Sequence, residues 1–350
     1  MMKALVYGGP GIKAWKSVAK PKILKPSDAI VKTLATTICG SDLHILKGDV
    51  PETPIGTILG HESIGEISEI GEAVKNFKVG QKVIVSCITS CGDCYYCKKD
   101  LQAHCLDGGW NLGHDIDGTQ AEFVRIPHAD HSLYPAPKEV SNESLLMLSD
   151  ILPTSNEVGV ISASIKKGDV VAIVGAGPVG LSALLNAKVR EPSQLIMIDM
   201  DNTRLELAKK LGATTVINPS KDNVLENINS LTQDVTKKSG VDVAIECVGV
   251  PQTFQTCQDI IAPGGRIANV GVHGKKVDLQ LQELWIKNIR ITTGLVSAYS
   301  TPALLKDITD GKLKPEVLVT HRFKLDQFEE AYDVFSNPTK TGAIKVLVEA

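Results

Sequence analysis

The sequence predicts an α/β protein of two domains, in which a β-rich domain is interrupted by a second domain with a doubly wound parallel sheet. Three observations predict this class. Residues 1–140 consist of short β-like runs that Gly and Pro separate, and from about residue 155 such runs alternate with helical segments. A glycine-rich turn joins one of these runs to an apolar helix near residue 175. Strand character then returns in the run Ile344–Val348, as expected if the first domain is completed after the second.

The β-rich part contains several runs that alternate polar and apolar residues. Such alternation is typical of antiparallel strands with one buried face, and it indicates a barrel-like sheet. The predicted strands are Lys3–Tyr7, Asp28–Leu34, Gly65–Ile70, Lys82–Ser86 and Ala121–Ile126.

The alternating part opens with Val170–Val174, an apolar β-branched run with the length of a buried parallel strand. Helix signals follow, with Gly212 as a stop and Pro251 as a start, and Pro263-Gly264-Gly265 predicts a turn before the next strand. The other predicted strands are Leu195–Ile198, Thr215–Ile217, Val241–Val248, Arg266–Val272 and Ile289–Leu295, and the predicted helices are Val179–Val189, Asn202–Leu211 and Asn223–Lys238.

The length of 350 residues favours two domains, because a single core rarely grows to this size. Two helices, Thr301–Thr309 and Asp326–Phe335, are predicted between the parallel sheet and the final strand. We place the crossings between the domains near residues 153 and 298. The β-rich domain then covers residues 1–153 and 298–350, and the doubly wound domain covers residues 154–297.

The composition is that of a soluble globular protein, with 43% hydrophobic and 22% charged residues. A net charge of −3 argues against a nucleic-acid or membrane-surface partner, and no apolar run approaches the length of a membrane span. The sequence starts without a secretory apolar region, so the cytoplasm is the expected location. The eight cysteines are then expected to be reduced, and clustered cysteines become metal ligands before disulfides.

Three glycines follow the first parallel strand in the spacing G-x-G-x-x-G. Gly175 permits a tight turn, the missing side chain of Gly177 lets a pyrophosphate approach the backbone, and Gly180 lets helix and strand pack closely. Pro178 and Val179 begin the helix, whose free N–H groups attract the anion. The order of strand, turn, helix and strand predicts a dinucleotide site.

Asp199 ends the next strand about twenty residues after the glycines. Its carboxylate can bind the adenosine ribose hydroxyls and would repel a 2′-phosphate, so we predict NAD rather than NADP despite the nearby Arg204. A doubly wound sheet binds its ligand where the strands end, and these ends are expected to meet the nicotinamide half. The residues concerned are Val248, Gly249, Val270, Gly271, Val272, Leu295 and Val296.

Four cysteines, Cys91, Cys94, Cys97 and Cys105, lie in CGDCYYCKKDLQAHC with the spacing C-x2-C-x2-C-x7-C. One C-x-x-C could be a redox pair, but this longer spacing favours a metal. Four thiolates can surround a tetrahedral Zn²⁺ with no open position, so the predicted site is structural.

A second group of candidate ligands is dispersed. Cys39 lies in ICGSDLH, and His61 and Glu62 lie in LGHESIGEI. A single Cys or His is more often structural than a ligand. These residues can therefore be interpreted only together with the other motifs of the chain.

The segments TICGSDLHIL, GHESIGEISEIG, the four-cysteine run and VGAGPVG, in this order and at these separations, resemble the zinc-dependent medium-chain alcohol dehydrogenases. The resemblance covers essentially the whole chain and implies a GroES-like catalytic domain and a Rossmann domain. LSDILPTS at residues 148–155 resembles the microbial branch in which an Asp is the third ligand of the catalytic zinc. That branch includes secondary-alcohol dehydrogenases and glutathione-independent formaldehyde dehydrogenases.

The resemblance implies that Cys39, His61 and Asp150 bind the catalytic zinc, with Glu62 in or near the coordination sphere. The fourth position stays open for water or substrate, an arrangement for which alcohol dehydrogenase is a general example. The sequence departs from the branch at residues 155–157, Ser-Asn-Glu, where a Gly and a later His are common. The substrate range is therefore left open.

The resemblance also implies roles for Ser41, His44 and Lys345, and Trp110 is a further candidate. Ser41 and His44 match the hydroxyl and imidazole that relay the alcohol proton to solvent. Trp110 is expected either to line the substrate pocket or to pack in the core. Lys345 matches a cation that meets the cofactor pyrophosphate, although it could also be a solvated strand residue.

The implied activity is that of an NAD-dependent zinc alcohol dehydrogenase and homo-oligomer, a dimer or tetramer. It would interconvert short primary or secondary alcohols with aldehydes or ketones, with zinc as Lewis acid and the nicotinamide as hydride acceptor. Formaldehyde, a polyol or a sugar are rival substrates. A non-catalytic, zinc-stabilised NAD-binding redox sensor would need no open metal position, and zinc-free quinone reductases would lack both clusters.

Overall fold

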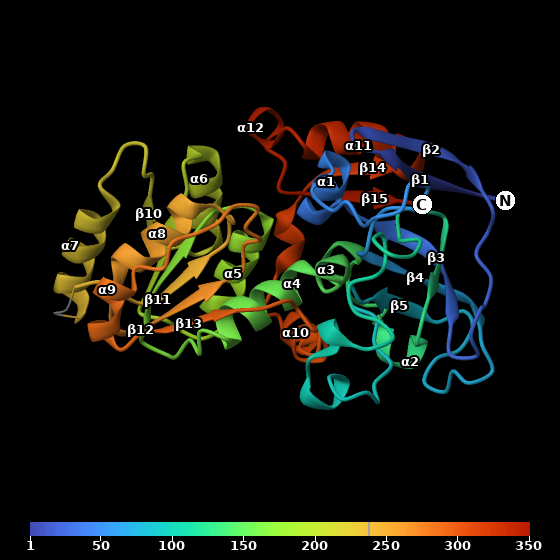
Figure 1. Ribbon diagram of the computed structural model, residues 1–350, viewed down its shortest axis with the longest axis horizontal. Helices are drawn as coiled ribbons and strands as arrows, with labels where there is room; N and C mark the ends of the chain where they lie inside the picture. The colour runs from blue at the N-terminus through green and yellow to red at the C-terminus, as the bar shows by residue number, and fades with distance from the viewer. Residues whose placement is uncertain (237–238) are drawn as a thin grey trace. The chain divides into compact units, whose positions relative to one another are not determined.

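The computed structural model describes residues 1–236 and 239–350, which form two compact units. The first unit combines Met1–Pro153 with Ser297–Ala350, and the second is Thr154–Val296 (Figure 1). No helix in the described part of the chain is long and apolar enough to span a membrane.

The second unit is built on a six-stranded parallel sheet with the order β10-β9-β8-β11-β12-β13. The chain winds outward from β8 to one edge and then returns to β11 beside β8, so the predicted doubly wound sheet is confirmed. The strands are β8 (Val170–Val174), β9 (Gln194–Ile198), β10 (Thr215–Ile217), β11 (Val241–Glu246), β12 (Ile261–Asn269) and β13 (Arg290–Thr293).

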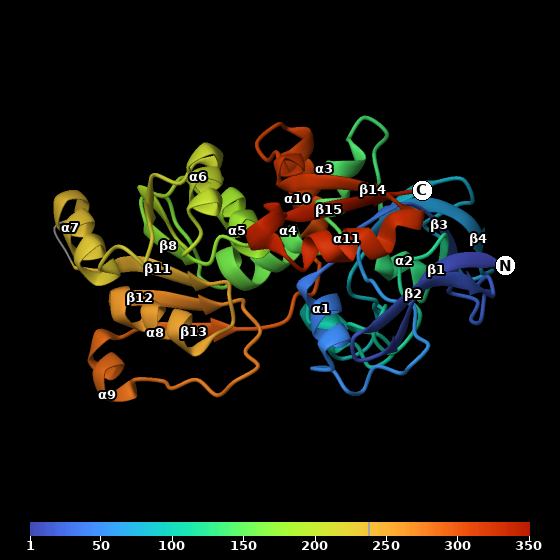
Figure 2. The ribbon, with the colours of Figure 1, turned by 90° about the horizontal axis from the view of Figure 1, so that it is seen from above.

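Helices cover both faces of this sheet. Figure 2 shows α5 and α6 together on one side of the sheet and α8 on the other. Val170, Ala172 and Val174 pack with Phe254 of α8, and the two intervening β8 residues point to the opposite face because strand side chains alternate. The helices are α5 (Pro178–Lys188), α6 (Asn202–Leu211), α7 (Val224–Thr236), α8 (Pro251–Ile260) and α9 (Leu281–Leu284), with a π-helix at Ser155–Ile161 and a 3₁₀ turn at Trp285–Lys287.

The first unit contains a mainly antiparallel seven-stranded sheet with the order β14-β15-β3-β4-β5-β7, in which β6 also pairs with β3, and a separate hairpin of β1 and β2. β15 is parallel to β14 and antiparallel to β3, so a segment that follows the second unit completes the sheet of the first. The strands are β1 (Met2–Gly9), β2 (Ile12–Val18), β3 (Ala29–Thr36), β4 (Ser63–Ile70), β5 (Lys82–Val85), β6 (Phe123–Ile126), β7 (Leu133–Pro135), β14 (Val319–Lys324) and β15 (Lys345–Glu349).

Short helices join these strands. A cluster of Ile38, Leu59, Phe328, Tyr332 and Val346 fills the space between α11 and the sheet. The helices are α1 (Gly40–Lys47), α2 (Ala129–Ser132), α3 (Asn142–Met147), α4 (Ile151–Thr154), α10 (Thr301–Thr309), α11 (Phe328–Phe335) and α12 (Pro338–Thr341), with 3₁₀ turns at Cys97–Lys99, Gln102–His104, Pro315–Leu318 and Leu325–Gln327.

The structure corrects the turn predicted at Pro263-Gly264-Gly265, which lies inside β12. The ladder with β11 passes from Ile261 directly to Arg266, so the Pro-Gly-Gly segment bulges out of the pairing instead of ending the strand. The predicted helix 326–335 begins at Phe328, after a 3₁₀ turn. Of the predicted helix 223–238, α7 covers Val224–Thr236, and Lys237 and Lys238 lie outside the described residues.

Candidate active site and metal centres

Cys39, His61, Glu62 and Asp150 converge in the first unit, with one ligand atom of each lying within 4.8 Å of those of the others. Asp150 Oδ2 lies 3.6 Å from Cys39 Sγ and 3.4 Å from His61 Nε2. His61, Glu62 and Asp150 are buried, and Cys39 is half-buried. The fold thus gathers three segments that lie far apart in the sequence.

Each donor stands at the end of a regular element. Cys39 is the N-cap of α1, where its backbone N–H donates to Asp42 Oδ2 at 2.8 Å. His61 and Glu62 directly precede β4, and Asp150 lies between α3 and α4. The backbone N–H of Cys87 donates to Ser149 O at 2.9 Å, which ties the Asp150 segment to the residues that follow β5.

Without a bound cation, burial and the neighbouring negative groups disfavour the charged forms of the Cys39 thiol and the Glu62 carboxyl. Burial raises the pKa of the Cys39 thiol, and the Asp150 charge raises it further. Burial also raises the pKa of Glu62 to about 7, although Lys345 opposes this shift. For His61 burial lowers the pKa, but the hydrogen bonds with Asp150 and Cys39 outweigh burial and raise it well above its usual value.

A divalent cation resolves this conflict, since it favours the deprotonated form of every donor. Sulfur, imidazole nitrogen and carboxylate oxygen are the donor types of zinc sites, and three protein ligands leave a fourth position for substrate. The buried Glu62 Oε2 accepts no hydrogen bond in the described structure, so it is a fourth candidate ligand atom in this cluster. The residues therefore fit a zinc ion.

A buried hydrogen-bonded chain supports the cluster from behind. Asp42 Oδ1 lies 3.8 Å from His61 Nδ1, so this buried carboxylate faces the imidazole of a candidate ligand. The amide of Gln120 donates to Asp42 Oδ2 and to Thr37 O, each at 3.1 Å, and accepts from the Tyr332 hydroxyl at 2.8 Å. Sequence reasoning missed Gln120 and Tyr332, because only the folded packing brings residue 332 to residue 120.

The structure disagrees with the predicted role of Lys345. Its ammonium lies 2.6 Å from Glu62 Oε1 and 3.2 Å from Ile38 O, and the residue is 1% exposed. Burial lowers the pKa of Lys345, but the charges of Glu62, Cys39 and Asp150 and the hydrogen bond with Glu62 together raise it. An ammonium enclosed by these partners argues against a pyrophosphate contact, and Lys345 is not a solvated strand residue either.

Ser41 and His44 lie on α1, beyond Cys39. Ser41 Oγ is 3.7 Å from Cys39 Sγ, so the hydroxyl is beside the predicted ligands. The His44 side chain is 46% exposed, and its Nδ1 lies 2.8 Å from Asp49 Oδ2. The helix therefore leads from the candidate site to solvent.

Trp110 lies next to the cluster, beside the candidate metal ligand His61. Its ring lies edge to face with the His61 ring, with 6.2 Å between the centroids. Trp110 also packs partly against the apolar cluster around Phe328, in agreement with the core interpretation, and its place in a substrate pocket stays a prediction.

The four cysteines Cys91, Cys94, Cys97 and Cys105 form a second group with metal-ligand geometry. Cys97 Sγ lies 3.5 Å from Cys94 Sγ and 3.9 Å from Cys91 Sγ, while Cys105 Sγ accepts from the Cys91 backbone N–H at 3.2 Å. The backbone N–H groups of Cys97 and Leu106 lower the pKa of Cys94 to about 6. Burial raises the pKa of the neighbouring Cys97 to about 12, so a bound cation is needed to favour the thiolate, which is the metal-binding form, at every position of the group.

In the second unit, the glycine turn links β8 to α5. A Cβ on Gly180 would lie 1.7 Å from Gly175 O, so helix and turn pack too closely for any side chain. A Cβ on Gly177 would meet only Arg204 Nη1, at 3.9 Å, which leaves the approach to this backbone open. Asp199 accepts from the backbone N–H groups of Ala176 and Asp201, at 2.6 and 2.8 Å, and stands at the end of β9.

The predicted strand-end residues lie on loops that Glu246 holds in place. Its Oε1 accepts from the backbone N–H groups of Val248 and Gly249, both at 2.9 Å, and a Cβ on Gly271 would lie 2.3 Å from its Oε2. The exposed fractions of the five apolar residues differ. Val248, Val272 and Leu295 are 46%, 77% and 48% exposed, Val270 is half-buried, and Val296 is buried at 4%.

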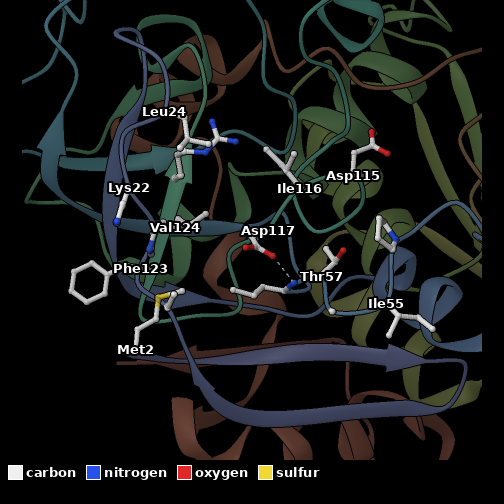
Figure 3. Close-up of a pocket in the computed structure, with 16 residues that line it drawn as sticks. Met2, Lys22, Leu24, Ile55, Thr57, Asp115, Ile116, Asp117, Phe123 and Val124 are labelled. Atoms are coloured by element: carbon white, nitrogen blue, oxygen red, sulfur yellow. Dashed lines mark hydrogen bonds between the residues drawn. The ribbon is translucent and has the colours of Figure 1, made fainter.

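A separate hollow of about 520 Å³ in the first unit contains none of the predicted site residues (Figure 3). Two of its charged side chains are already paired: Asp117 accepts from the Ile58 backbone N–H at 3.0 Å, and Arg125 donates to Asp28 at 3.1 Å. We assign no ligand to this hollow.

Comparison with known proteins adds independent observations. The chain matches the families described as "Alcohol dehydrogenase GroES-like domain", over residues 25–138, and "Zinc-binding dehydrogenase", over residues 178–310. An alcohol dehydrogenase of Cupriavidus necator is 34% identical over 369 residues, covering 100% of this chain and 99% of that protein.

Two solved structures share the fold over the whole chain. The apo form of zinc-dependent alcohol dehydrogenase 2 from Streptococcus pneumonia has 52% identity and a TM-score of 0.93, covering 100% of this chain and 98% of that one. Alcohol dehydrogenase TADH from Thermus sp. ATN1 has 33% identity and a TM-score of 0.92, covering 99% of each chain.

Proposed function

The chain belongs to the zinc-dependent alcohol dehydrogenase family, and we propose that it transfers a hydride between a short primary or secondary alcohol and NAD. The observation that carries the proposal is the convergence of Cys39, His61 and Asp150. Glu62 lies beside them with its Oε1 paired with Lys345. In this proposal Cys39, His61 and Asp150 bind the metal, and one position remains for the substrate oxygen.

When bound, zinc supplies a Lewis acid for the substrate oxygen and NAD supplies the hydride acceptor. The Ser41 hydroxyl, 3.7 Å from Cys39 Sγ, takes up the proton that the alcohol loses and passes its own hydroxyl proton on toward His44. His44 then delivers it to solvent at the exposed side of α1. Asp42 holds the His61 ring in the orientation that turns Nε2 toward the metal.

NAD binds at the glycine turn of the second unit, with its pyrophosphate at the open backbone of Gly177 and the N-terminus of α5. Asp199 binds the adenosine ribose and Arg204 flanks it. The loops that end β11, β12 and β13 contact the nicotinamide half. The four-cysteine group holds a second, structural zinc.

The protein forms a homo-oligomer in this proposal. β13 is the edge strand of its sheet, and an unpaired edge strand offers backbone groups to another copy. Trp285 and Ile286, in the 3₁₀ turn that precedes this strand, are 69% and 67% exposed. A cytoplasmic location agrees with eight cysteines that are all free of disulfides.

A turnover screen tests the proposal. Short primary and secondary alcohols, polyols, sugars and formaldehyde would each be offered with NAD and with NADP. We expect NAD-dependent oxidation of short alcohols, whereas activity confined to polyols or formaldehyde would reassign the substrate. Absence of any turnover by protein that carries zinc would support the sensor interpretation.

The cofactor assignment has its own test. Asp199→Gly removes the carboxylate that repels a 2′-phosphate, so the NAD to NADP preference in kcat/KM should fall. The matched control is Asp201→Gly, because the Asp201 side chain caps α6 through Thr203 and Arg204 N–H groups instead. An unchanged preference in Asp199→Gly would contradict the assignment.

A further inference from the structure

Trp110 is stacked on a second ring that neither the metal ligands nor the proton relay includes. The His114 imidazole lies 4.5 Å from the Trp110 ring, centroid to centroid, with 16° between the planes. His114 Nδ1 lies 3.1 Å from the Trp110 carbonyl oxygen, which can only accept, so Nδ1 is the donor. The side chain is 12% exposed, and its buried Nε2 makes no hydrogen bond in the described structure.

Two carboxylates face this imidazole. Glu52 Oε1 lies 3.8 Å from Nε2, and Asp115 Oδ2 lies 3.6 Å from Nδ1. Both carboxylates are more than half exposed, so they restrain the ring less than the stack and the Trp110 carbonyl do. The imidazole is thus held mainly by two groups of Trp110, the indole ring and the backbone carbonyl oxygen.

The loop that carries both rings is fixed against the residue before the ligand His61. A Cβ on Gly113 would lie 2.5 Å from Gly60 N, and one on Gly118 would lie 2.0 Å from Gly60 O, so the two backbones touch. Thr119 N donates to Gly60 O at 2.9 Å. Movement of this loop would therefore disturb His61 itself, and the remaining freedom of Trp110 is that of its side chain.

We propose that His114 is a positioning residue that holds the Trp110 indole as a fixed wall beside the catalytic metal, and thereby limits the size of the alcohol. One face of the indole is covered by the imidazole, and its ring lies edge to face with His61. A substrate held at His61 lies alongside this wall. The inference rests on the proposed alcohol dehydrogenase function.

The first test compares His114→Ala with His114→Phe, which keeps an aromatic ring for the stack but no hydrogen bond to the carbonyl. The measurement is the kcat/KM ratio of propan-2-ol to 1-phenylethanol, with NAD. In His114→Ala the ratio should fall by about tenfold or more, mainly through a higher kcat/KM for 1-phenylethanol, because the wall that excludes bulk is released. In His114→Phe it should stay within about twofold, since the stack supplies the effect.

The second test observes the indole directly and needs no turnover. The chain has three tryptophans, so protein labelled with 5-fluorotryptophan gives three ¹⁹F signals, and Trp110→Phe identifies the relevant one. His114→Ala should shift and broaden that signal and leave those of Trp15 and Trp285 in place. His114→Phe should keep it sharp. His321→Ala, on β14, is the matched control and should change neither the signal nor the substrate ratio.

The two tests decide separately whether His114 fixes the indole and whether the fixed indole limits the size of the substrate. An unchanged Trp110 signal in His114→Ala would overturn the clamp, and a changed signal with an unchanged substrate ratio would overturn its role in size selection. If the wild-type protein oxidises no alcohol, the proposed function fails, while the ¹⁹F result still decides whether His114 fixes the indole. Equal zinc content and melting temperature in the variants would show that the fold is intact.

Discussion

The two metal centres of the first unit differ in how the chain builds them. The cysteine group uses one ligand type from the single run 91–105, whereas the catalytic cluster takes three or four kinds of donor from segments between residues 39 and 150. Cys91 and Cys94 are partly exposed, but His61 and Glu62 are only 3% and 1% exposed. A local centre can stabilise its own loop, while a dispersed centre needs the finished sheet and in return can leave a position to the substrate.

Among variants that affect one metal centre and not the other, Asp150→Ala is expected to have the largest effect. Zinc should fall from about two per chain toward about one, because the cysteine group is closed and self-contained. Turnover should fall by more than the roughly 100-fold that loss of an outer hydrogen-bond partner costs. Elemental analysis and steady-state kinetics are the measurements, and NAD binding should survive. Full zinc with near-normal turnover would show that Asp150 is not a ligand.

The converse variant is Cys94→Ser, which should remove the other zinc and spare the catalytic one. Metal binding in such a centre is coupled to folding, so the melting temperature should drop, by roughly 2–4 °C for each kcal/mol lost in a unit of this size. Cys87→Ala is the control, because Cys87 belongs to neither cluster. A variant that keeps full stability would contradict the structural role.

The hydrogen-bonded layer behind the catalytic cluster predicts a smaller effect. Gln120→Met keeps the side-chain length but removes the donor to Asp42 and the acceptor of Tyr332, so the affinity of the catalytic site for zinc should fall by about 10- to 100-fold. Tyr332→Phe should cost less, because the bond from Gln120 to Asp42 remains. Equal zinc dissociation from Gln120→Met and wild type would sink the idea of a supporting layer, and the cysteine group should be unaffected in both variants.

The smallest effect is expected for His44→Gln, at the solvent end of α1. Loss of an exposed relay should slow alcohol oxidation by less than the roughly 100-fold typical of a group that transfers the proton directly. The loss should be greatest at low pH, where release of the alcohol proton is hardest. Asp49→Asn, which removes the partner of the His44 imidazole, should give a weaker version of the same change. An unaltered pH–rate profile would mean that protons leave by another route.

The contrast between a local and a dispersed centre also explains which features can be predicted from the sequence. The cysteine spacing and the strand, glycine turn and helix after Val170 are local patterns, so both could be predicted from neighbouring residues. Gln120, Tyr332 and the pairing of Lys345 with Glu62 depend on partners up to 283 residues away, for which no local signal exists. β2 escaped prediction because it is mostly exposed or half-buried and lacks a clear apolar alternation.

The ion pair between Lys345 and Glu62 constrains when this site can be completed during synthesis of the chain. The two residues are 283 positions apart, and translation at about 5–20 residues per second separates their synthesis by roughly 15–60 s. Cys39 and His61 are synthesised before this interval and Asp150 within it, while β3 still lacks its neighbour β15 and Glu62 lacks its ammonium partner. The nucleotide-binding unit is synthesised within this interval. In the proposed site, the catalytic centre is therefore completed late in synthesis, although Cys39 and His61 are made early.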